Sequence, residues 1–248
     1  MPAVQPIRHA ATVIIAREAD GDCEIFMLKR TSKASFAGGM YVFPGGRVDG
    51  DDHLHKYDAF RTGPSDRQLP QQEALGHEWR GYWIAGIRES FEEAGLLLAY
   101  TESGRLLGYD DHNRERFDAY RHPLHAGDIS LLEICRRERL SLAVDHIHLV
   151  NRFITPPGRP RRFDTRFFLA EAPEGQTGGH DEKETVDSIW ISAKEAIERN
   201  DAEEFDLMRV TRVQLEMLAR HATHEQLVTW ATTNDTFPIG RPLMPPGS

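Results

Sequence analysis

A short acidic helix is the feature of this sequence that most constrains its fold. Within residues 84–98, a helix drawn at about 100° per residue puts its apolar side chains on one narrow arc, namely Ile84, Ile87, Phe91 and Ala94. It puts three carboxylates on roughly the opposite arc, namely Glu89, Glu92 and Glu93. Gly95 predicts the end of this helix, and the leucine run at 96–98 predicts a buried strand directly after it.

The three carboxylates have two interpretations. At spacing i, i+3 and i+4 they are neighbours on the helix, where like charges repel unless a cation or solvent separates them. A hard divalent cation would turn that repulsion into ligation, and oxygen-only ligands favour Mg²⁺ or Mn²⁺ over zinc. The alternative is a solvated acidic face, which is the more common use of such a pattern. Residues upstream favour the metal interpretation.

A glycine-rich segment, 45–52, follows the short apolar stretch 41–43 and Pro44. Glycines in such a loop let a backbone carbonyl approach a metal or a phosphate closely. Together with residues 88–96, the segment resembles the Nudix box, whose pattern is Gly, five residues, Glu, seven residues, then Arg-Glu-aliphatic-any-Glu-Glu-any-Gly-aliphatic. Ser90 stands at the aliphatic position, and Asp52 stands where the first glutamate is expected.

A long insertion splits this box. Residues 53–87 are 35 residues at a place where the pattern has seven. The insertion is similar to the one in the Nudix subgroup that contains the mammalian peroxisomal coenzyme A diphosphatase. We predict that residues 53–80 form loop and short helix near the surface, and that regular helix resumes near Trp79.

The resemblance implies metal-assisted hydrolysis of a diphosphate joined to an organic group. It implies that Glu89, Glu92 and Glu93 bind Mg²⁺ or Mn²⁺, and it makes the carbonyl of Gly46 and the carboxylate of Asp52 further candidate ligands. Glu89 and Glu93 are expected to be essential for catalysis.

Catalysis also needs a proton acceptor and a group that orients the carboxylates. Arg88 is expected to orient the glutamate one helical turn on by charge-assisted hydrogen bonding. In many Nudix enzymes a carboxylate from a late loop joins the metal site or acts as base. The acidic loop 178–187 offers Glu182 and Glu184, with Glu184 preferred, and plain solvation of this loop is the alternative. Either Glu89 or Glu184 is expected to take the proton of the attacking water.

Candidate substrate contacts lie in two places. Arg30 and Phe43 stand at positions similar to a pattern that precedes the box in some coenzyme A diphosphatases. Beside the turn at 156–160, Arg162 and Arg166 lie four residues apart in a predicted strand and therefore share a face. Arginine forks suit phosphate oxygens, so we predict that the three arginines contact the substrate. We predict the same for Phe43, because of its place in the pattern before the box. A surface network of salt bridges is the alternative for the arginines.

The resemblance implies coenzyme A or acyl-coenzyme A as the leading substrate, cleaved at its diphosphate. ADP-ribose, NADH and a capped RNA end are alternatives within the same chemistry. A Nudix-fold ligand sensor without turnover is an alternative of another class. The intact Arg-Glu and Glu-Glu pairs favour an enzyme, because a domain that only binds has no need to keep acidic repulsion.

Strands that alternate with helices indicate an α/β protein, and we expect one domain over residues 1–248. The resemblance implies a Nudix-type α/β/α sandwich with a mixed sheet, the insertion at 53–80 and a helical C-terminal extension at 201–248. The predicted strands cover residues 11–16, 24–29, 146–155, 162–170 and 188–191, the first two as a hairpin about Gly21. The predicted helices cover residues 113–125, ending near Pro123, then 130–140, 205–218 and 223–231, with Ser130 and Ser192 as caps.

Composition and net charge limit the classes of partner that this chain is expected to bind. A net charge of −9 argues against general affinity for nucleic acid, which depends on neutralising phosphates. No run approaches the roughly 18 apolar residues of a membrane helix, and residues 1–10 lack the apolar core of a secretory signal. Two cysteines make no disulfide framework. We expect a cytoplasmic protein that acts on a small-molecule diphosphate, and Nudix relatives suggest a homodimer by analogy.

Overall fold

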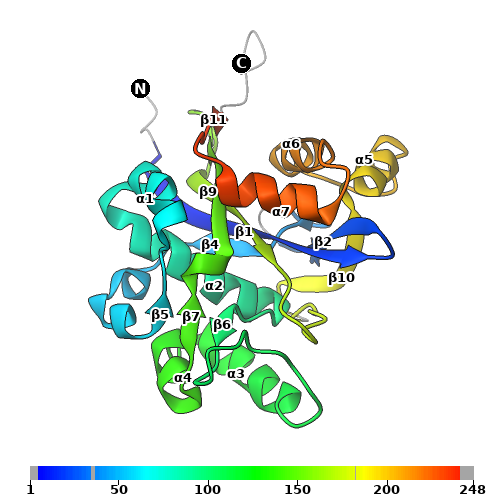
Figure 1. The fold of residues 1–248 in the computed structure, drawn as a ribbon. Coiled ribbons are helices and arrows are strands. Elements are labelled where there is room, and N and C mark those ends of the chain that lie inside the picture. Colours follow the sequence, from blue (N-terminus) through cyan, green and yellow to red (C-terminus); the bar gives the residue numbers. More distant parts are fainter. Residues whose placement is uncertain (1–4, 35–36, 182, 241–248) are drawn as a thin grey trace.

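The structure is a computed structural model that describes residues 5–34, 37–181 and 183–240. Glu182 and the last part of the predicted C-terminal extension lie outside the described residues. The main sheet has the order β10-β2-β1-β9-β8-β11, with β3 paired to β2 and β4 paired to β1 (Figure 1). Its strands are β1 (Ile7–Ala19), β2 (Asp22–Arg30), β3 (Tyr41–Val42), β4 (Gly45–Arg47), β8 (Ile147–Ile154), β9 (Arg162–Glu171), β10 (Thr185–Ser192) and β11 (Ile239–Gly240).

This sheet is mixed, as predicted. β1 runs parallel to β9 over ten residue pairs, and β11 runs parallel to β8, while the other pairs are antiparallel. A second, three-stranded sheet has the order β5-β7-β6, formed by β5 (Arg61–Thr62), β7 (Ser141–Ala143) and β6 (Ala99–Tyr100). The predicted hairpin is β1–β2, and its two turn residues Asp20 and Gly21 have φ of 50° and 84°, the backbone that a tight hairpin turn requires.

Both faces of the main sheet are covered, which explains the nearly continuous apolar runs of its central strands. On one face, α2 (Trp79–Ala94) packs against Ala11, Val13 and Phe168. On the other face, Ile14 and Phe167 belong to a second apolar cluster with the C-terminal helices α5 (Ala193–Asp201), α6 (Arg209–Leu218) and α7 (His224–Thr233) (Figure 1). The predicted α/β/α sandwich and the helical C-terminal extension are confirmed.

The acidic helix ends as predicted, but no strand follows it at once. Gly95 has φ of 69°, and its N–H donates to the carbonyl of Phe91. Residues 96–98 are buried without strand pairing, and β6 begins only at Ala99. The side-chain amide of Gln176 bonds both the N–H and the carbonyl of Leu97, so it occupies the place of a neighbouring strand. Ser90, where an aliphatic residue was expected, is buried and donates to the carbonyl of Gly86.

The insertion lies deeper than predicted. It contains short 3₁₀ turns, β5 and α1 (Leu69–Leu75), and α2 begins at Trp79 as expected. Gln68 and Gln71 are completely buried. Gln68 donates to the carbonyls of Val144 and Ile147. Gln71 accepts the N–H of Leu149, so two side-chain amides fasten the insertion to the start of β8. The prediction of a surface segment is therefore wrong for this part.

Two helix boundaries also differ from prediction. α3 (Arg114–Ala126) continues through Pro123 and ends where Gly127 adopts φ of 77°. α6 begins at Arg209 rather than 205, because Asp206 accepts the N–H of Tyr41 and the preceding residue, Phe205, stacks on the Tyr41 ring.

The predicted serine caps are confirmed. Ser130 accepts the N–H of Glu133 at the start of α4 (Leu131–Glu138). Ser192 accepts the N–H of Glu195 at the start of α5. Among the described residues, no helix combines the length and the apolar character needed to cross a membrane.

The anchoring of the insertion makes a stability prediction. Gln68→Ala removes two buried hydrogen bonds, from the side-chain amide to the carbonyls of Val144 and Ile147 at 2.8 and 3.1 Å. Their loss should lower the free energy of unfolding by about 1 to 3 kcal/mol, to be measured by urea denaturation. Gln72→Ala is the matched control, because the Gln72 side chain makes no hydrogen bond to the described residues, and it should change the free energy of unfolding by less than about 0.5 kcal/mol. Equal losses in the two variants would contradict the anchoring role.

Candidate active site

The carboxylates of α2 are buried. The exposed fractions are 9% for Glu89, 7% for Glu92 and 5% for Glu93. Buried carboxylates need a partner for their charge, so the alternative of a solvated acidic face is wrong.

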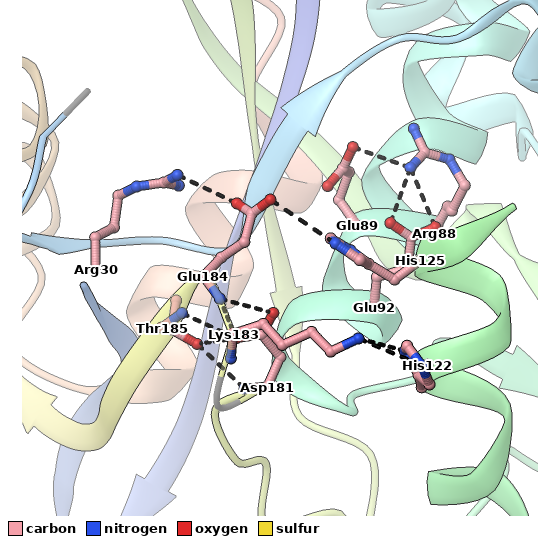
Figure 2. A network of polar contacts seen from close by, with 10 residues as sticks. All are labelled: Arg30, Arg88, Glu89, Glu92, His122, His125, Asp181, Lys183, Glu184 and Thr185. Atoms are coloured by element: carbon pink, nitrogen blue, oxygen red, sulfur yellow. Dashed lines mark hydrogen bonds and ion pairs between the residues drawn. The ribbon is translucent and has the colours of Figure 1, made fainter. Parts of the chain in front are cut away.

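Arg88 is the first of these partners (Figure 2). Its Nη1 donates to Glu89 Oε1 at 3.0 Å and to Glu92 Oε2 at 3.2 Å, so the contact expected one helical turn on is present. Its Nη2 donates to the backbone carbonyl of Arg47 at 2.8 Å. One guanidinium therefore joins two carboxylates of α2 to the strand β4.

Asp52, a carboxylate from outside α2, is a further partner of the Arg88 guanidinium. Its Oδ1 and Oδ2 accept Nε and Nη2 of Arg88, each at 3.0 Å, and Oδ2 also accepts the N–H of Asp49 at 2.8 Å. Asp52 is only 1% exposed. Both of its oxygens are already occupied, which argues against the predicted role as a metal ligand. The shorter carboxylate instead forms a bidentate pair that fixes the guanidinium.

Two glycines bring the backbone of β4 against the carboxylates. The N–H of Gly45 donates to Glu93 Oε2 at 2.9 Å. A Cβ on Gly46 would lie 2.5 Å from Glu89 Oε1, which is closer than real Cβ atoms approach. Glycine at position 46 therefore leaves the space in which the Glu89 carboxylate rests.

Burial sets the electrostatics of this group. Loss of hydration raises the pKa of Glu93 to about 8, although the N–H of Gly45 and the charge of Arg30 oppose the shift. The same cause, with Glu93 and Glu92 as like charges nearby, raises the pKa of Glu89 well above its usual range. Burial also raises the pKa of Glu92 against the opposing effect of Arg88. Burial thus disfavours the charged form of all three carboxylates, and a cation beside them would favour it.

The buried carboxylate oxygens of Glu89, Glu92 and Glu93 are donors that fit a hard divalent cation. Among the described residues, no three carboxylate, histidine or cysteine side chains are already gathered around a point where a metal ion would sit. The hydrogen bonds explain this, because Glu92 is turned toward Arg88 and Glu93 toward the N–H of Gly45. The donors fit the ion by chemistry and by burial, and Glu89 and Glu93 lie closest to the glycines of β4.

The late acidic loop meets the same site (Figure 2). Glu184 forms ion pairs with Arg30 at 3.2 Å and with His125 of α3 at 3.8 Å. Asp181 shapes the loop by accepting the N–H groups of Glu184 and Thr185 at 3.1 and 2.9 Å. Glu184, the preferred loop carboxylate, therefore lies with Arg30 at one site. His125 carried no motif in the sequence that would have identified it.

The carboxylates of α2 and Glu184 line one cavity of about 850 Å³. Its charged and glycine lining includes Arg30, Gly45, Gly46, Arg88, Glu89, Glu92, Glu93, His125 and Glu184. Its lining also includes Phe43, Phe153, Arg161, Phe163, Thr165, Phe167 and the first turn of α6. A cavity of this size, lined by both charged groups and aromatic side chains, suits a phosphorylated organic molecule.

The prediction for Arg162 and Arg166 is not supported by their positions. They do share a face of β9, but it is the face opposite the cavity, because Phe163, Thr165 and Phe167 are the residues that line it. Arg166 is buried in an ion pair with Asp164, and Arg162 donates to the carbonyl of Thr155. The other two predicted contacts, Arg30 and Phe43, do line the cavity.

Comparison with known proteins finds relatives of this chain. The family model of the NUDT19 Nudix domain matches residues 57–211, more than half of the chain. The acyl-coenzyme A diphosphatase NUDT19 of Gallus gallus is 28% identical over 82% of this chain and 65% of its own length. The protein of the same name from Xenopus laevis is 25% identical, over 71% of this chain and 54% of its own length. The putative nudix hydrolase 7 of Caenorhabditis elegans is 30% identical, over 77% of this chain and 53% of its own length.

The chain therefore spans between about half and two thirds of the length of these curated relatives. Among solved structures, a NUDIX hydrolase from Alicyclobacillus acidocaldarius superimposes with a TM-score of 0.73 at 24% identity. The match covers 96% of this chain and 100% of that one, so the two share their fold.

The buried carboxylates predict a metal-dependent stability. Mn²⁺ should raise the melting temperature of the wild type, by the equivalent of about 2.7 kcal/mol at a concentration 100 times its dissociation constant. Glu93→Gln should lose most of this shift. Without metal, however, the variant should be no less stable than the wild type, because a neutral amide replaces a carboxyl group whose charged form burial disfavours.

Glu225→Gln is the control for this thermal-shift measurement, because Glu225 is exposed on α7. It should retain the full shift with Mn²⁺. A full shift in Glu93→Gln as well would show that the ion binds elsewhere.

Proposed function

This chain belongs to the Nudix family, in the group described by the NUDT19 Nudix domain, and from that premise we propose that it is a metal-dependent pyrophosphohydrolase. The observation that carries the proposal is the buried group of Glu89, Glu92 and Glu93 in the wall of a cavity large enough for a nucleotide-sized molecule. The proposed cofactor is Mg²⁺ or Mn²⁺, held by Glu89 and Glu93 with Glu92 and the backbone near Gly46.

Coenzyme A or an acyl-coenzyme A is the proposed substrate. The names of the NUDT19 relatives support this choice, although the chain spans only part of their length. The cavity supports it as well, because Arg30 and Arg161 offer guanidinium groups to phosphate oxygens and Phe153, Phe163 and Phe167 offer apolar surface to an organic group. ADP-ribose, NADH and capped RNA are the alternatives, and a sensor without turnover is a further one.

Different side chains of the site have different roles in the proposed reaction. A divalent cation, when bound, supplies a Lewis acid that stabilises negative charge on the phosphoryl oxygens and acidifies water. Arg88 and Asp52 hold Glu89 and Glu92 in place by the bonds described above. Arg30 offers its guanidinium to the diphosphate from the wall of the cavity.

One carboxylate must take the proton of the attacking water. We assign this proton to Glu89, whose carboxylate lines the cavity against Gly46. The ion pairs of Glu184 with Arg30 and His125 support the assignment, because they occupy Glu184 in holding Arg30.

A substrate panel tests the proposal. The purified protein is incubated with coenzyme A, acyl-coenzyme A, ADP-ribose, NADH and diadenosine compounds in Mg²⁺ or Mn²⁺, and the products are separated by chromatography. We expect cleavage of the coenzyme A species to an adenosine bisphosphate and a phosphopantetheine product. Glu93→Gln should abolish turnover with the fold intact. If neither metal supports cleavage of any compound, the enzyme proposal fails and the sensor alternative takes its place.

Gly46 provides a sharper test of the carboxylate geometry. In Gly46→Ala the new methyl group must displace the Glu89 carboxylate, whose atoms lie at 2.5 to 2.7 Å from the Cβ position. A displacement on the order of 1 Å in a catalytic group lowers kcat by about 100-fold, measured under saturating substrate. Gly50→Ala is the control, because its Cβ would meet nothing within 4 Å, and it should keep nearly full activity. Full activity in Gly46→Ala would contradict the position of Glu89.

A further inference from the structure

Arg121 of α3 joins the end of the acidic helix to the loop of Glu184. Its Nη2 donates to the backbone carbonyl of Glu93 at 2.9 Å and to that of Gly179 at 2.8 Å. Its Nε donates to the carbonyl of Glu92 at 3.4 Å. One side chain thus holds the backbone of two of the α2 carboxylates and the backbone from which the Glu184 loop departs.

Other contacts tie the same three elements together. The N–H of Gly179 donates to the carbonyl of Ala94, at the last residue of α2. Further along the loop, Lys183 Nζ lies 2.6 Å from His122 Nδ1, and Glu184 forms its ion pair with His125 (Figure 2). α3 therefore contacts the loop at its beginning through Arg121 and near its end through two histidines.

Arg121 caps the end of α2 and holds the loop with the same group. The N–H groups of Gly95 and Leu96 bond the carbonyls of Phe91 and Ser90 only. The carbonyls of Glu92 and Glu93 are bonded by Arg121, and the nitrogen that reaches Glu93 also bonds Gly179. A Cβ on Gly95 would lie 3.2 Å from Arg121 Nη1, so Gly95 also leaves the space for this approach.

We propose that Arg121 is a positioning residue, which fixes the distance between the Glu93 end of α2 and the loop that carries Glu184. The inference rests on the proposed function for its effect on turnover. The structural part of the inference is independent of the proposed function, because the geometry of the loop can be measured in the protein without substrate.

Hydrogen exchange measured by mass spectrometry tests the structural part. In Arg121→Ala, the amides of Gly179, Glu184 and Thr185 and those of Gly95 and Leu96 should exchange about tenfold faster or more, the factor that the loss of one charged hydrogen bond produces. The amides of β9 should keep their wild-type rates. Arg121→Lys retains a cation with fewer donors and should lie between the two.

Arg116→Ala is the matched control, because Arg116 lies on the same helix, is exposed and pairs with Glu138 at the surface. It should leave exchange in the loop unchanged. If Arg121→Ala does not fold, Arg121→Lys carries the comparison. Wild-type exchange in the loop, or faster exchange spread evenly over the whole protein, would overturn the proposal.

Kinetics then test the consequence for catalysis. Arg121→Ala should lower kcat by about 100-fold while KM changes by less than about threefold, and Arg121→Lys should recover part of kcat. A rise in KM with unchanged kcat would overturn the positioning role. If the wild type cleaves nothing, the proposed function fails and the exchange measurement still decides whether Arg121 positions the loop.

Discussion

The site depends on one charged contact, the pair of Arg88 with Asp52. Three carboxylates on one helix face cannot be buried together without a cation, and Arg88 supplies the positive charge from their own helix. Asp52 binds the guanidinium through both of its oxygens, and the carbonyl of Arg47 in β4 accepts a further hydrogen bond from it. This pair joins the two halves of the motif across the insertion, and the cluster of buried carboxylate oxygens is what makes the site suitable for a divalent cation.

The rest of the fold brings chemistry from distant parts of the chain to this pair. β4 runs beside β1 and places two glycines against the carboxylates, while β2 ends at Arg30 in the wall of the cavity. β9 and the first turn of α6 contribute further lining of the cavity. α3 lies between the acidic helix and the loop of Glu184, so a segment outside the motif holds two parts of the site together.

The elements governed by local rules could be predicted from the sequence. The acidic helix with its glycine stop, the hairpin about Gly21 and the serine caps follow from periodicity and from turn chemistry. Predictions failed where the answer lay in a distant partner. The alternation of β9 shows that Arg162 and Arg166 share a face, but only the packing shows that this face is turned away from the cavity. Asp52 meets Arg88 across 35 inserted residues, at 53–87, and His125 and Arg121 belong to no motif. Gln176 replaced a strand that local pattern alone predicts after Gly95.

The central claim is that the buried carboxylates of α2 hold a divalent cation beside the glycines of β4. The most direct test is anomalous scattering from crystals soaked in Mn²⁺, with data collected near the manganese absorption edge. The account predicts a peak within bonding distance of Glu89 and Glu93 and next to the backbone of Gly45 and Gly46. A cation that binds only at Glu184 and His125, or no ordered cation in the cavity at saturating Mn²⁺, would contradict it.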